Sequence, residues 1–122
     1  MKTVAVIGAS SNRHKFGNKA FRAFQAEGHK VIPINPNERE VEGIPTYASV
    51  TDVPEQIDMA TVYVPPEIGI TLLDGFEQKQ IAEIWINPGA ESDELLAEAR
   101  RRRLKVIEAC SIVGIGQNPY SY

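Results

Sequence analysis

Cysteine is almost absent from this sequence, since Cys110 is the only one in 122 residues. An intramolecular disulfide is therefore impossible, which fits a reducing compartment, and we expect a cytoplasmic protein. The sequence also lacks any apolar run of about 18 residues, which excludes a membrane-spanning helix. Its first residues, Met1 to Val4, lead directly into a strand-like segment, so we expect no signal peptide.

An excess of charge of one sign is also missing. Lys and Arg number 13 and Asp and Glu number 16, which gives a net charge of −3 at pH 7. A general attraction to nucleic acid or to an anionic membrane is therefore not expected. The one concentrated basic run, Arg100–Arg103, falls at the end of an expected helix, where cations complement the helix dipole. Any anion site must be local.

What the sequence does contain is five short apolar runs rich in β-branched residues. Continuous apolar runs without alternation are typical of strands covered on both faces, as in a parallel sheet. Segments with helical spacing separate them, which favours right-handed strand–helix–strand crossovers. The predicted fold is α/β: one Rossmann-like, three-layer domain over residues 1–122, with a five-stranded, mainly parallel sheet and helices on both faces. The expected strands are Thr3–Gly8, Lys30–Pro33, Asp58–Val64, Ala82–Asn87 and Leu104–Glu108, and the expected helices are Asn18–Glu27, Glu67–Gln80 and Ser92–Arg103, with a short helical piece over Ser49–Glu55.

In such folds ligands bind beyond the carboxyl ends of the strands, near the point where the strand order reverses. Gly8 ends the first expected strand and permits a tight turn, and the small Ala9 and Ser10 let backbone N–H groups approach an anion. The helix that follows adds positive potential through its dipole. Arg13 and Lys15 offer charge-assisted contacts to phosphate. We therefore predict a phosphate-binding loop after the first strand.

This loop does not carry the dinucleotide fingerprint G-x-G-x-x-G. Ser10 stands where the second glycine would be, and the next glycine is Gly17. The second strand also ends without the acidic residue that holds the ribose in nicotinamide enzymes, because Asn35 and Pro36 stand there. Both features disfavour NAD. An NAD(P)- or nucleotide-dependent enzyme, or a ligase subunit that needs a partner chain, stays open as an alternative.

Five segments recur in order along the whole chain and together carry a resemblance. They are Val6-Ile7-Gly8-Ala9-Ser10, Pro33-Ile34-Asn35-Pro36, Gly43-Ile44-Pro45-Thr46-Tyr47, Val62-Tyr63-Val64-Pro65-Pro66 and Trp85-Ile86-Asn87-Pro88-Gly89-Ala90. With them the sequence resembles the stand-alone CoA-binding proteins, which are similar to the first domain of the succinyl-CoA synthetase alpha subunit. The resemblance implies that coenzyme A or an acyl-CoA binds at the strand ends. The implied role is that of a non-catalytic carrier, a sensor, or a module that presents CoA to another enzyme.

The resemblance also implies which residues contact the ligand. The turn after the first strand would hold the phosphates, and the loops after the second, third and fourth strands would flank the rest of the molecule. The implied residues are Gly8, Ala9, Ser10, Ser11, Arg13, Lys15, Asn35, Pro36, Val64, Pro65, Pro66, Asn87, Pro88 and Gly89. The sequence departs from the synthetases at Asn37-Glu38-Arg39, where they carry Gly and Lys. The acidic Glu38 opposes a polyphosphate.

No carboxylate pair, Ser–His–Asp set or Cys–His pair is evident, so we predict no catalytic residue and no enzyme. His14 and His29 lie in unrelated segments without a second ligand at metal spacing, so we predict no metal site. Cys110 follows the fifth strand, at the same sheet edge as the predicted site. A thiol-redox protein that uses Cys110 with CoA stays open, although free cysteine is more often a packing residue. Whether the chain forms a homodimer or associates with a partner enzyme stays open.

Overall fold

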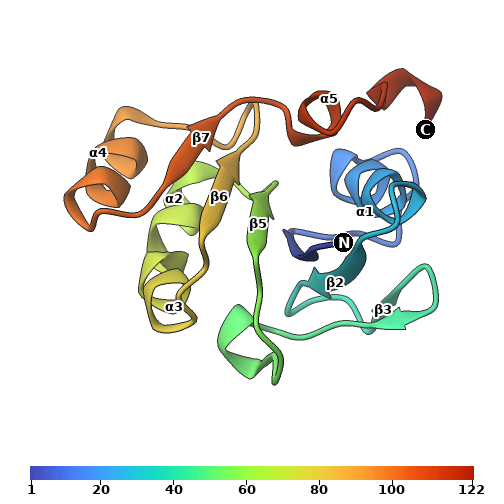
Figure 1. The fold of residues 1–122 in the computed structure, drawn as a ribbon, viewed down its shortest axis with the longest axis horizontal. Coiled ribbons are helices and arrows are strands. Elements are labelled where there is room, and N and C mark those ends of the chain that lie inside the picture. Colours follow the sequence, from blue (N-terminus) through green and yellow to red (C-terminus); the bar gives the residue numbers. More distant parts are fainter.

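The central sheet of the computed structural model, which describes residues 1–122, has five strands in the spatial order β2-β1-β5-β6-β7 (Figure 1). All four strand pairings are parallel, so the predicted sheet is confirmed and is wholly parallel. Its strands are β1 (Thr3–Ile7), β2 (Lys30–Ile34), β5 (Met59–Val62), β6 (Glu83–Ile86) and β7 (Val106–Glu108). A separate antiparallel pair, β3 (Glu40–Val41) and β4 (Ile44–Pro45), extends the loop after β2.

Helices cover both faces of this sheet, as the strand–helix alternation predicts (Figure 1). On one face lie α1 (Phe16–Ala26) and α5 (Ser111–Gly114), and on the other lie α2 (Pro66–Gly69), α3 (Leu73–Gln78) and α4 (Asp93–Arg101). Three single turns of 3-10 helix complete the chain: η1 (Val50–Asp52), η2 (Ile70–Leu72) and η3 (Pro119–Ser121). No helix combines the length and the apolar character needed to cross a membrane.

Alternate residues of β1 divide the core into two layers. Val4 and Val6 pack in the cluster that contains Phe21 of α1, whereas Ala5 and Ile7 belong to the cluster on the opposite face. These four side chains are at most 2% exposed. This two-sided burial explains why β1 is a continuous apolar run rather than an alternating one.

The prediction of one helix over Glu67–Gln80 is wrong, because the structure divides that segment into α2, η2 and α3. The hydroxyl of Thr71 donates to the carbonyl oxygen of Ile68 at 2.6 Å, so a side chain competes for a helix carbonyl group. Gly69 and Gly75 lower the helix propensity on either side of this turn. The break matters for function because the broken segment lines a pocket described below.

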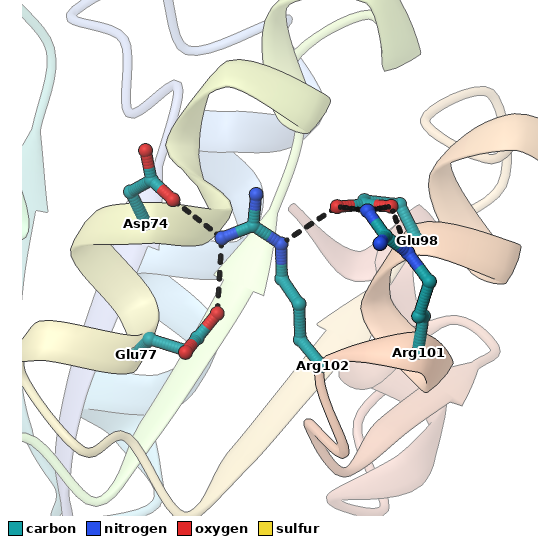
Figure 2. A network of polar contacts seen from close by, with 5 residues as sticks. All are labelled: Asp74, Glu77, Glu98, Arg101 and Arg102. Atoms are coloured by element: carbon teal, nitrogen blue, oxygen red, sulfur yellow. Dashed lines mark hydrogen bonds and ion pairs between the residues drawn. The ribbon is translucent and has the colours of Figure 1, made fainter.

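The arginine run at the end of α4 does more than complement a helix dipole (Figure 2). The guanidinium of Arg102 donates to Glu98 within its own helix at 3.0 Å, and reaches across to α3, where it contacts Glu77 at 2.9 Å and also Asp74. Hydrogen bonds from Arg101 and then Arg102 lower the pKa of the Glu98 carboxyl. Arg102 therefore joins two helices that cover the same face.

Replacing Arg102 with alanine is expected to lower the melting temperature more than replacing Arg101, which pairs only with Glu98 of its own helix. The Glu98 carboxyl has a lowered pKa, so its contribution is present above its unfolded pKa of about 4.3 and is lost as pH falls through the folded value. Thermal melts of the two variants at pH 7 and at low pH test this. Equal losses at pH 7, or losses that do not become smaller in acid, would contradict it.

Candidate functional site

The strand order reverses beside β1, which lies between β2 and β5. Loops that leave β1, β2, β5 and β6 therefore meet at one edge of the sheet, where open α/β sheets bind ligands. Two pockets lie there, an apolar one of about 440 Å³ and a polar one of about 560 Å³. They share four lining residues, Gly8, Asn35, Asn37 and Val64, so together they form one groove.

The apolar pocket lies between the loop after β4 and the broken α2–η2–α3 segment. Its apolar lining comes from Val50 in η1, Ile68 in α2, Leu72 in η2 and Phe76 in α3, with Val64 at the entrance to the polar pocket. The side chain of Ile68 is half exposed at the rim. This pocket is suited to a flat apolar group that has one polar edge near Asn35.

The polar pocket begins at the turn after β1, where the backbone of Gly8 has a φ of +85°. A Cβ atom at this position would lie 3.0 Å from Cγ1 of Val64 and 3.1 Å from the carbonyl oxygen of Tyr63. The positive φ and the close approach of the β5 loop both favour glycine here. The N–H of Gly8 donates to the carbonyl oxygen of Ile34 at 3.0 Å, which ties the turn to β2.

Gly17, in the first turn of α1, is a site residue that the sequence analysis missed. A Cβ atom there would lie 2.3 Å from the carbonyl oxygen of Gly8, so only glycine lets α1 begin against the β1 turn. Close packing of helix on strand is the role of the third glycine in the dinucleotide fingerprint. In this chain a longer loop separates that glycine from Gly8. The sequence feature that could have identified Gly17 is its position directly before the predicted helix Asn18–Glu27.

Backbone N–H groups at the start of α1 point to an anion site. Those of Ser10, Phe16 and Gly17 make no hydrogen bond within the protein, and all three residues line the polar pocket together with Lys15. Unpaired amides at a helix N-terminus, with the helix dipole behind them, bind anions. The loop itself is held in place, because the Asn18 side chain donates to the carbonyl oxygen of Ser10 at 2.9 Å.

Residues 2–115 match the family model described as CoA binding domain. The chain belongs to the CoA binding domain family. It is 32% identical over 115 residues to the alpha subunit of acetate–CoA ligase (ADP-forming) II of Pyrococcus furiosus, which covers 92% of this chain and 24% of that subunit. It is 33% identical to acetate–CoA ligase (ADP-forming) II of Archaeoglobus fulgidus, with 96% of this chain and 18% of that protein covered. The chain thus spans about a quarter or less of these ligases.

Solved structures give the same fold for this CoA binding domain. A conserved hypothetical protein of Pyrococcus furiosus aligns with a TM-score of 0.85 and 30% identity, over 93% of this chain and 99% of that one. An acetyl-coenzyme A synthetase of Candidatus Korarchaeum cryptofilum, in complex with phosphate and ADP, aligns with a TM-score of 0.76 and 29% identity. There the match covers 88% of this chain and 25% of the synthetase. The predicted family resemblance and Rossmann-like fold are confirmed.

Most of the ligand contacts that the resemblance implied lie together in the CoA binding domain. The groove is lined by Gly8, Ser10, Lys15, Asn35, Pro36, Val64, Pro65, Pro88 and Gly89. Five others do not line it: Ala9, Ser11, Arg13, Pro66 and Asn87. Of these five, Ala9 and Asn87 are buried. For all fourteen residues the role as a ligand contact stays a prediction.

The five residues that do not line the groove have other positions or contacts in the structure. Ala9 is fully buried among the core residues on the α1 face. Arg13 pairs with Glu42 at 3.1 Å, and Pro66 is the first residue of α2. The N–H of Ser11 donates to the Glu38 carboxylate. Asn87 is 1% exposed and belongs to a buried polar cluster.

That buried cluster lies beneath the carboxyl ends of β5 and β6. Asn87 donates to the hydroxyl of Thr61 at 2.7 Å, and the Ser111 hydroxyl lies 2.7 Å from the same Thr61 oxygen. The hydroxyl of Tyr63 lies 3.1 Å from that of Ser111, and burial raises the pKa of Tyr63 to about 12. The tyrosine therefore stays protonated at neutral pH. The cluster holds the strand ends in place and offers no group that titrates near pH 7.

Cys110 caps α5 and is partly buried against the core on the α1 face, outside the groove lining. No group of three or more His, Cys, Asp and Glu residues is arranged to hold a metal ion. The site is thus a groove with a polar and an apolar part, and what it can do chemically is bind an anion next to an apolar ring.

Proposed function

We propose that this domain binds coenzyme A or an acyl-CoA in the groove, as a non-catalytic carrier, sensor or module that presents CoA to a partner enzyme. One observation carries the proposal. Unpaired backbone amides and Lys15 line a polar pocket that continues, past Asn35 and Val64, into an apolar pocket. A ligand that fits both must join phosphates to an apolar ring.

Coenzyme A has these parts in this order. Its adenine ring suits the apolar pocket between Leu72 and Phe76, where burial of the ring faces is favourable. Its pyrophosphate suits the amides of Ser10 and Gly17, close to Lys15. The pantetheine arm carries amide groups that can pair with exposed backbone around Pro88 and Gly89. Each pocket also falls within the range of about 300–1,000 Å³ typical of ligand sites.

The residue at the end of β2 argues for CoA over NAD. Asn35 donates to the carbonyl oxygen of Ala9 at 2.8 Å and accepts from the N–H of Asn37 at 2.9 Å. Its side chain therefore braces two loops and is not a carboxylate that accepts from two ribose hydroxyls, as nicotinamide enzymes require. The expected order of affinity is CoA, then ADP, then NAD, measured by calorimetry on the purified chain. Equal or tighter binding of NAD would contradict the proposal.

A ligase subunit that works with a partner chain is the second candidate, because relatives named as ADP-forming acetate–CoA ligases are 32% and 33% identical to this chain. The non-catalytic module and the ligase subunit differ in whether they take part in a catalysed reaction. A presenting module binds CoA but forms no ATP from acetyl-CoA, ADP and phosphate. Native mass spectrometry of the purified chain reports bound CoA and any partner or second copy. ATP formation by the chain together with a co-purified partner chain would contradict the non-catalytic role and favour the ligase subunit.

Replacing Lys15 with alanine is expected to weaken CoA binding at least about tenfold, because a charge-assisted contact to phosphate contributes about 1.5–3 kcal/mol. The matched control is Lys2→Ala, which removes the same charge before β1, at the opposite edge of the sheet. Calorimetry at two salt concentrations measures both variants, and the salt dependence should fall only for Lys15→Ala. Similar losses in the two variants would show that only general charge matters.

A further inference from the structure

A carboxylate already lies in the polar pocket of this domain. Glu38, four residues after the end of β2, lines that pocket, and its Oε2 accepts a hydrogen bond from the backbone N–H of Ser11. Ser11 belongs to the loop whose amides are proposed to hold the ligand's phosphates. Hydrogen bonds from Ser11 and the nearby charge of Lys15 lower the pKa of the Glu38 carboxyl, so it is ionised at neutral pH.

The backbone that carries Glu38 is held, whereas its side chain is not. The N–H of Glu38 donates to the carbonyl oxygen of Asn35 at 3.4 Å, and the hydroxyl of Thr46 donates to the carbonyl oxygen of Glu38. The N–H of Thr46 also donates to the next carbonyl group, that of Arg39, at 3.1 Å. The carboxylate, in contrast, accepts its hydrogen bond from Ser11 in the opposite loop. The side chain can therefore leave by rotation alone, without any movement of the loop.

We propose that Glu38 acts as an internal competitor for the phosphate groups of the ligand, so that its carboxylate must rotate off the loop before they bind. The inference rests on the proposed function for its biological meaning, but the competition concerns any phosphate. Glu38 then sets the affinity: it satisfies the Ser11 amide and faces Lys15 in the free protein, and it repels an incoming anion. Only ligands whose other contacts with the protein outweigh the free-energy cost of displacing the Glu38 carboxylate would then bind tightly.

An alternative role for the Glu38 carboxylate makes the opposite prediction. A carboxylate near a nucleotide can accept hydrogen bonds from ribose hydroxyls, as the acidic residue does in nicotinamide enzymes. In that case neutralising Glu38 would weaken nucleotide binding and leave simple anions unaffected. The two readings are therefore separated by one substitution and two probes.

The test is Glu38→Gln, which keeps the size of the side chain and removes its charge, with inorganic pyrophosphate and CoA as probes. Both are expected to bind the variant at least about fivefold more tightly than the wild-type chain, as judged by calorimetry. Glu40→Gln is the control: it removes the same charge two residues away, from an exposed position in β3, and should change neither affinity by more than about twofold. Glu38→Ala, with the same expected direction, serves if Glu38→Gln does not fold.

The two probes separate the inference from the proposed function. Tighter pyrophosphate binding by Glu38→Gln supports the inference even if neither protein binds CoA. The absence of CoA binding would contradict only the proposed function. Equal or weaker pyrophosphate binding by the variant, including no detectable binding to either protein, would overturn the inference. If CoA alone then bound more weakly to the variant, Glu38 would be a ligand contact rather than a competitor.

Discussion

Replacing Gly17 with alanine is expected to lower the free energy of unfolding by about 3 kcal/mol and to weaken CoA binding more than about tenfold. The new Cβ would lie 2.3 Å from the carbonyl oxygen of Gly8 and 3.4 Å from Cα of Ala9. Both neighbours are backbone atoms, so no side-chain rotation relieves the contact. The start of α1 must then move off the β1 turn and take the amides of the polar pocket with it.

Gly69→Ala is the matched control for this substitution. Gly69 has ordinary helical backbone angles, and a Cβ there would lie 3.5 Å from Cδ2 of Leu95, which is a normal contact. Alanine should therefore leave stability unchanged or raise it by up to about 1 kcal/mol, with CoA binding unchanged. Urea unfolding and calorimetry report both quantities. If Gly17→Ala unfolds and binds like the wild-type chain, the close approach of α1 to the turn is not what shapes the site.

Local sequence patterns predicted most of the architecture, because the strands are buried on both faces and the helix ends carry their own signals. Ser92, the first residue of the predicted helix Ser92–Arg103, has a side chain that accepts from the N–H of Leu95 at 3.0 Å. Gly28, which follows the predicted helix Asn18–Glu27, has a φ of +83° that glycine adopts readily. The alternation of strands and helices then fixes which loops share the edge of the sheet, and hence the position of the groove.

Contacts between segments that lie far apart in the sequence could not be predicted from local sequence patterns. The apolar pocket is lined both by Leu72, next to the break at Thr71, and by Val50 from a distant loop, and neither feature follows from helical spacing. The hydrogen bond between Glu38 and Ser11 joins residues 27 positions apart. Side-chain direction in such loops depends on tertiary packing. For the same reason the sequence could name Asn87 as a ligand contact without revealing what its side chain does.

Replacing Asn87 with alanine is expected to lower the free energy of unfolding by about 3 kcal/mol while changing the CoA affinity of the folded protein by less than about threefold. Besides its bond to Thr61, the Asn87 side chain donates to the carbonyl oxygen of Val62 at 2.9 Å and accepts from the N–H of Ser111 at 2.8 Å. Alanine would leave these partners buried without their hydrogen bonds, and each such group costs about 1–3 kcal/mol.

Asn35→Ala gives the contrasting result, because Asn35 lines both pockets and its side chain is only partly buried. Its loss should weaken CoA binding more than it lowers stability, whereas for Asn87→Ala the order is reversed. Urea unfolding with and without CoA measures both effects in each variant. Loss of CoA binding with unchanged stability in Asn87→Ala would mean that Asn87 contacts the ligand directly, as its place in the family resemblance implies. Loss of stability alone makes it the residue that holds the ends of β5 and β6 and the start of α5 together, beneath a groove it does not enter.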